Sequence, residues 1–186
     1  MIYALATLLG AGLGGATTYL LSRRQRARRE SKPLPVRRIL LPFTGTQVSR
    51  RAMDAALRLA GVEHATLMPA FLARVPLHLD LDSPLPRQCS LGMPLLEAIE
   101  QRALAQGVPV DSRVERGRSY RHALARLLER EHFERVIISA TNDPRVGLSG
   151  ADIVWVLDRA QAEVLILRPA PEDRRAVTAS EISGHF

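Results

Sequence analysis

The stretch ILLPFTGT, residues 39–46, sets an apolar run directly before a glycine-containing turn. The run has the composition of a buried strand, and it breaks at Thr44-Gly45-Thr46. A strand that ends in such a turn before a helix presents backbone N–H groups, and such turns often hold a phosphate. Because Ser49 is a good N-cap for a following helix, the stretch predicts the first strand–turn–helix unit of an α/β domain.

The same alternation of strand and helix continues along the chain. Further apolar strand segments are expected at residues 64–72, 108–115, 135–140 and 163–169. Further helices are expected from Pro94 to Gly107, after Ser119 and from Ser149. Apolar residues at helical spacing mark the inner face of each: Leu96, Ile99 and Ala103 on the first, Tyr120 and Leu127 on the second, and Val154 and Leu157 on the third. This pattern predicts an α/β fold, a doubly wound five-stranded parallel sheet with helices on both faces.

Residues 1–22 form an apolar segment whose first 21 residues contain no Asp, Glu, Lys, Arg or His. About 20 such residues cross the bilayer core as a helix. A cleavable signal peptide is the rival interpretation, but it would have its positive charges before the apolar run rather than after it. We therefore expect a single transmembrane anchor, and the small residues at positions 6, 10, 14 and 18 leave open whether it dimerises.

The formal charge of +7 comes from one short segment, residues 23–38, and the rest of the chain is balanced. Since positive flanks stay in the cytoplasm, we expect a single-pass protein of the inner (cytoplasmic) membrane with its C-terminal domain in the cytoplasm. Residues 23–36 would be a basic juxtamembrane linker on anionic lipid. Nucleic-acid binding is the alternative, and we do not expect it because no aromatic side chain interleaves the arginines.

Residues 37–170 are expected to form the α/β domain, and residues 171–186 a polar, disordered tail. His78, Asp80 and Asp82 alternate in one loop, but no second His or Cys cluster supports a metal site. A single cysteine, Cys89, suits a reducing cytoplasm. No nucleophile–base pattern is visible, so we expect neither an enzyme nor a bound metal.

Three passages resemble the universal stress protein family: residues 37–60 (RRILLPFTGTQVSRRAMDAALRLA), 107–129 (GVPVDSRVERGRSYRHALARLLE) and 135–169 (RVIISATNDPRVGLSGADIVWVLDRAQAEVLILRP). The last is the most specific, because it ends on a Gly-containing turn, a helix and an apolar strand in the family's manner. The resemblance implies a strand order of 3-2-1-4-5 and a homodimer formed through the last strand.

The resemblance also implies a nucleotide site, from which this sequence departs. ATP-binding members carry an acid after the first strand, where this chain has Thr44, and a Gly-x2-Gly-x9-Gly-Ser/Thr loop after the fourth. The corresponding loop runs from Ala140 to Gly150, is three residues shorter and lacks the early glycines. Asp143 would repel a phosphate, and Arg145 would partly compensate.

A vestigial nucleotide site is therefore expected, made of Thr44, Gly45, Thr46, Ala140, Asp143, Arg145, Ser149 and Gly150. We expect no cofactor, with ATP as the alternative ligand. The function predicted is a membrane-anchored, non-catalytic stress-response or signalling module with an unknown protein partner. An ATP- or AMP-binding sensor at the membrane is the alternative, and an enzyme of the wider fold group is a third class.

Overall fold

The computed structural model describes residues 37–140, 148–168 and 176–184. The described residues belong to one compact unit, Arg37–Phe186. The predicted anchor at 1–22 and linker at 23–36 thus lie outside the described residues. Among the helices that are described, none combines the length and the apolar character needed to span a bilayer.

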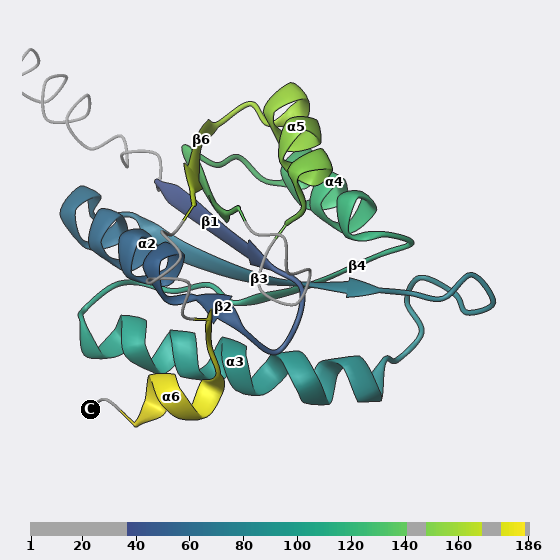
Figure 1. Cartoon of the computed structure of the whole chain (residues 1–186), viewed down its shortest axis with the longest axis horizontal. Coiled ribbons are helices and arrows are strands. Elements are labelled where there is room, and N and C mark those ends of the chain that lie inside the picture. The colour runs from purple at the N-terminus through teal and green to yellow at the C-terminus, as the bar shows by residue number, and fades with distance from the viewer. Residues whose placement is uncertain (1–36, 141–147, 169–175, 185–186) are drawn as a thin grey trace, which may run out of the picture. The chain divides into compact units, whose positions relative to one another are not determined.

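A five-stranded parallel sheet forms the centre of the described unit (Figure 1). Its strands are β1 (Arg38–Phe43), β3 (Thr66–Arg74), β4 (Arg113–Gly117), β5 (Arg135–Ser139) and β6 (Glu163–Leu167). They lie in the order β4-β3-β1-β5-β6. Taken along the chain, this is the order 3-2-1-4-5 that the family resemblance implies, so the predicted parallel sheet and its strand order are confirmed.

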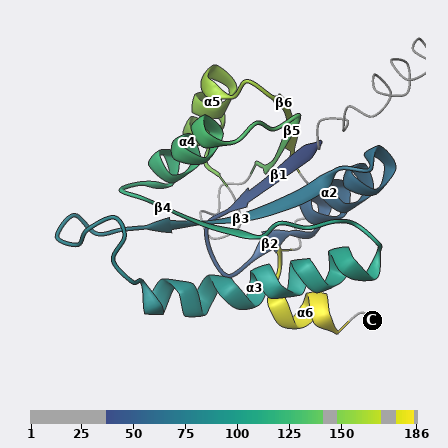
Figure 2. The ribbon, with the colours of Figure 1, turned by 180° about the vertical axis from the view of Figure 1, so that it is seen from behind.

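Two helical layers cover the sheet, one on each face (Figures 1 and 2). One layer holds α2 (Arg50–Glu63) and α3 (Pro86–Ala105), and the other holds α4 (Tyr120–Arg130) and α5 (Gly150–Arg159). The central strand serves both layers, because successive side chains of a strand point to opposite faces. Ile39 and Leu41 belong to the core under α2 and α3, whereas Leu40 belongs to the core under α4 and α5.

Three helices begin at the serines that the sequence indicates. The Oγ atoms of Ser49, Ser119 and Ser149 accept hydrogen bonds from the backbone N–H groups three residues on. Such a cap contributes about 1 kcal/mol because it satisfies an otherwise unpaired donor. The inner faces are only partly as predicted: Tyr120, Val154 and Leu157 are exposed, while the residues expected on α3 are buried.

The helix α3 begins at Pro86, so the prediction that it starts at Pro94 is wrong. Pro94 lies inside the helix, where its missing N–H removes one backbone hydrogen bond. Gly92 and Leu95, on both sides of this position, are buried, so the helix is packed against the core where it contains the proline. The third strand is also shifted: β4 starts at Arg113, five residues later than expected.

The expected disordered tail is wrong for residues 176–184. β7 (Ala176–Val177) pairs antiparallel with β2 (Val48–Ser49), and α6 (Ala179–Ser183) packs against α3. Val177 and Ile182 are buried in the core under α2 and α3. Burying a side chain of this size contributes about 1.5–3 kcal/mol, which adds to the pairing with β2 and the packing on α3.

Candidate functional site

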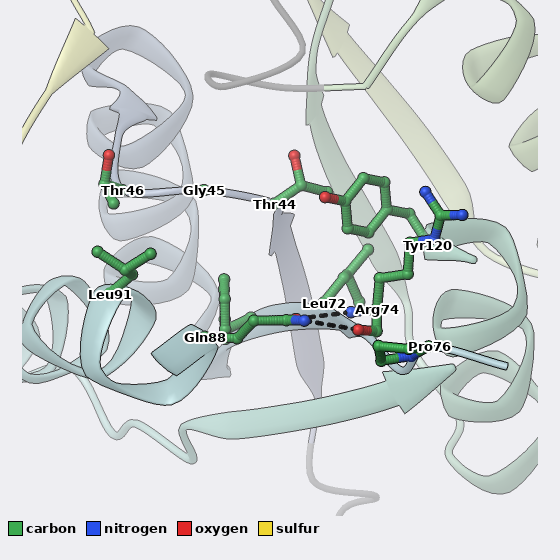
Figure 3. Close-up of a pocket in the computed structure, with 10 residues that line it drawn as sticks. Thr44, Gly45, Thr46, Leu72, Arg74, Pro76, Gln88, Leu91 and Tyr120 are labelled. Atoms are coloured by element: carbon green, nitrogen blue, oxygen red, sulfur yellow. Dashed lines mark hydrogen bonds between the residues drawn. The ribbon is translucent and has the colours of Figure 1, made fainter. Parts of the chain in front are cut away.

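A cavity of about 370 Å³ opens at the carboxyl ends of β1 and β3 (Figure 3). Its lining comes from the turn after β1, the end of β3, α3 and the start of α4: Thr44, Gly45, Thr46, Phe71, Leu72, Arg74, Pro76, Gln88, Leu91 and Tyr120. This position lies beyond the carboxyl ends of parallel strands, beside the switch in strand order between β1 and β5 at which open α/β sheets bind ligands. The volume lies within the range of small-molecule sites.

The turn Thr44-Gly45-Thr46 forms one wall of the cavity. β1 ends at Phe43, and the chain then turns into β2 and the cap of α2 at Ser49. Thr44 is buried, so its side chain belongs to the packed part of this wall. Three of the eight predicted site residues are therefore brought together here.

Gln88 and Arg74 close one end of the cavity through a pair of hydrogen bonds (Figure 3). The Arg74 N–H donates to Gln88 Oε1 at 3.0 Å, and Gln88 Nε2 donates to the Arg74 carbonyl oxygen at 2.7 Å. Sequence reasoning missed both residues, because a glutamine in an expected loop carries no motif. Tyr120 was also missed as a lining residue, since its place in the apolar pattern suggested the core.

The wall at Pro76 is held by Arg118, which follows β4. Its Nη1 donates to the carbonyl oxygens of Pro76 at 2.6 Å and Leu79 at 2.7 Å. The backbone N–H of Arg118 in turn donates to Nδ1 of His122 at 3.1 Å. A charged donor shared between two carbonyl groups fixes the loop between β3 and α3, and so fixes this side of the cavity.

The N-terminus of α5 contains two further predicted residues, Ser149 and Gly150, neither of which is among the described residues that line the cavity. The Asp152 carboxylate occupies this helix end: Oδ2 accepts from the Ser149 backbone N–H at 3.2 Å and from Ser149 Oγ at 2.5 Å. Arg121 Nε donates to Oδ1 at 2.6 Å. A negative charge therefore already sits where a helix N-terminus would attract a phosphate.

Of the three remaining residues of the predicted nucleotide site, the structure describes one, Ala140. Ala140 follows β5 and forms a parallel bridge with Leu148. Asp143 and Arg145 lie outside the described residues. Across the part of the chain that the structure describes, no group of three or more His, Cys, Asp or Glu side chains is placed to hold a metal ion.

Solved structures with this architecture identify the fold. A universal stress protein family member from Burkholderia pseudomallei is 24% identical, has a TM-score of 0.53, and is matched over 72% of this chain and 96% of its own. A universal stress protein solved in complex with cAMP is 21% identical, with a TM-score of 0.55 and coverage of 72% and 98%. The universal stress protein of Lactobacillus plantarum is 17% identical, with a TM-score of 0.54 and coverage of 73% and 99%.

The chain has the fold of the universal stress proteins. No protein-family model matches the sequence, and neither does any curated protein. The assignment of this fold therefore depends on the sheet order and the helical layers of the described residues. The match covers nearly the whole length of each of these proteins.

Asp152→Asn should destabilise the protein at neutral pH and change its pH dependence. Burial raises the pKa of Asp152, but hydrogen bonds from Ser149 and Arg121 lower it by more, so the pKa lies below its ordinary value. The Asp152 carboxylate thus stabilises the fold at pH values above the pKa that this carboxyl has in the unfolded chain. The contribution is lost as the pH falls through the lower pKa that it has in the folded protein. We expect a loss of about 0.5–2 kcal/mol near pH 7 that disappears in acid.

Chemical unfolding of the full-length protein in mild detergent, followed by the fluorescence of its single tryptophan, Trp155, measures this loss. Asp158→Asn is the matched control, because its exposed side chain lies at the other end of the same helix. Equal pH profiles for the wild type and Asp152→Asn would show that the carboxylate does not stabilise α5.

Proposed function

We propose that the chain is a non-catalytic signalling module of the universal stress protein kind, in which ATP binds weakly or not at all. The observation that carries this proposal is the Asp152 carboxylate on the N-terminus of α5. A triphosphate at this helix end would meet the negative charge of Asp152 and would compete with it for the N–H and hydroxyl groups of Ser149. The fold supports a role in stress signalling, because the proteins that share it are universal stress proteins.

A nucleotide-binding sensor is the second candidate function. The cavity at Thr44-Gly45-Thr46 favours this function. It offers the backbone of this turn and the aromatic side chain of Tyr120 to a ligand beyond the carboxyl ends of the strands. One protein of the same fold was solved with cAMP. The two candidates differ in the affinity of the unmodified protein for adenine nucleotides.

Titration calorimetry of the full-length protein in detergent should give a dissociation constant for ATP of about 1 mM or weaker, several kcal/mol short of a micromolar site. Asp152→Asn should bind ATP more tightly than the wild type, because the competing charge is removed. Asp158→Asn should leave the affinity unchanged. Micromolar binding by the wild type would reject the signalling module with weak ATP binding and favour the sensor.

Residues 1–22 are proposed to anchor the protein in the cytoplasmic membrane, with the basic segment 23–36 on the lipid headgroups and the domain in the cytoplasm. The uncharged apolar segment and the position of the +7 charge support this arrangement. A reporter that is active only outside the cytoplasm, fused after Phe186, should be silent, and the protein should sediment with membranes. An active reporter or a soluble, shortened product would exclude this topology.

A homodimer through β6 is proposed as the assembly, in addition to an unidentified protein partner and without nucleic acid. β6 lies at the edge of the sheet, and Ile166 on it and Val154 and Leu157 on α5 are exposed apolar side chains. An exposed edge strand with apolar neighbours favours pairing with another chain.

Ile166→Glu should convert the dimer to a monomer in sedimentation experiments in detergent, because it places a charge on the proposed contact. Leu104→Glu, an exposed apolar position on α3, is the control that should remain dimeric. If Ile166→Glu leaves the dimer intact, the contact lies elsewhere, for example on the small residues of the anchor.

A further inference from the structure

The backbone of Arg74 presents a hydrogen-bonding edge that the sheet itself does not use. β3 is paired with β1 as far as Phe71, opposite Phe43, and then continues to Arg74 beside β4 alone. The Val75 N–H donates to the Gly117 carbonyl oxygen of β4 at 2.8 Å. Because alternate residues of a parallel strand bond to opposite neighbours, the N–H and C=O of Arg74 face the side on which β1 has ended.

Gln88 supplies the partners that β1 does not. Its carboxamide offers one donor and one acceptor side by side, and both are used by the same residue, Arg74. Gln88 stands in the first turn of α3, where a glutamine can bond back to the start of its own helix. Here it reaches across to the strand instead, and it lines the cavity in doing so (Figure 3).

The carboxamide presents the same pair of groups as the pairing edge of adenine. Adenine offers an amino donor at N6 beside the ring acceptor N1, and proteins read an unpaired base by hydrogen bonds to this edge. The backbone N–H and C=O of Arg74 are complementary to that pair. Leu72, Leu91 and Tyr120 provide apolar surface in the same cavity, which suits a flat base.

We propose that Gln88 is an internal occupant of a base-binding edge, and that displacing it admits an adenine base to the Arg74 backbone. This inference rests on the proposed function, because it gives a second reason, separate from Asp152, why adenine nucleotides bind weakly to the domain. A tethered side chain competes at a high effective concentration, so a free base has to displace two hydrogen bonds that are already formed. Gln88 thereby lowers the affinity for the base independently of the charge that opposes phosphate at α5.

Adenosine is the probe, because it carries the base without any phosphate. The full-length protein in detergent is titrated and the dissociation constant obtained from ligand-observed NMR. Gln88→Met keeps the length of the side chain and its helix preference but loses the carboxamide, and Gln88→Ala removes the bulk as well. Gln101→Ala is the matched control, a glutamine on the exposed side of the same helix.

Gln88→Met and Gln88→Ala should bind adenosine about tenfold more tightly than the wild type and Gln101→Ala, since two neutral hydrogen bonds of ordinary net strength correspond to a change of that size. N6,N6-dimethyladenosine, which has no amino donor, should gain nothing. Adding Tyr120→Ala to Gln88→Met should cancel the gain if the base lies in this cavity. Unfolding curves for each variant verify that it is folded.

An unchanged affinity for adenosine in both Gln88 variants would overturn the inference. An equal gain for adenosine and its dimethyl derivative would also overturn it, because the effect would then come from space rather than from the exposed donor–acceptor pair. These outcomes differ from failure of the proposed function, which would appear as micromolar binding of ATP by the wild type.

Discussion

The unequal lengths of β1 and β3 determine the site. β1 ends at Phe43, opposite Phe71, and the pairing of the two strands ends there. The ring centroids of Phe43 and Phe71 are 5.6 Å apart. Beyond this point β3 continues, the chain after β1 turns away at Thr44, and a hollow opens between them. The cavity and the unused backbone edge of Arg74 are both consequences of this one difference in length.

Glycine at position 92 places α3 over the hollow. A Cβ at Gly92 would lie 2.5 Å from the ring of Phe71, so the helix can cross the strand at this distance only without a side chain. Gln88 precedes Gly92 by four residues and lies on the same helical face. The close approach at Phe71 therefore brings Gln88 to Arg74, three residues further along the strand, where it forms its two hydrogen bonds.

The sequence allowed the strands to be predicted where apolar runs are continuous and the helices where a serine caps them. The start of α3 could not be predicted from the sequence, because Pro86 and Pro94 both fit the first turn of a helix. The packing of Gly92 against Phe71 favours the start at Pro86. The C-terminal segment was missed because Val177 and Ile182 are isolated among polar residues, and their burial depends on a surface formed by distant helices. Gln88 was missed because its partner is a backbone, which has no signature in the sequence.

Two groups of polar atoms in the described domain, one beside the cavity and one at the start of α5, are bonded by side chains of the protein itself. The carboxamide of Gln88 satisfies the strand edge, and the carboxylate of Asp152, supported by Arg121, satisfies the helix end. Each contact stabilises the domain, and in the functions proposed above a ligand group of the same kind competes with it. Because the two contacts involve different elements, α3 with β3 and α5 with α4, base and phosphate affinity can change independently of each other.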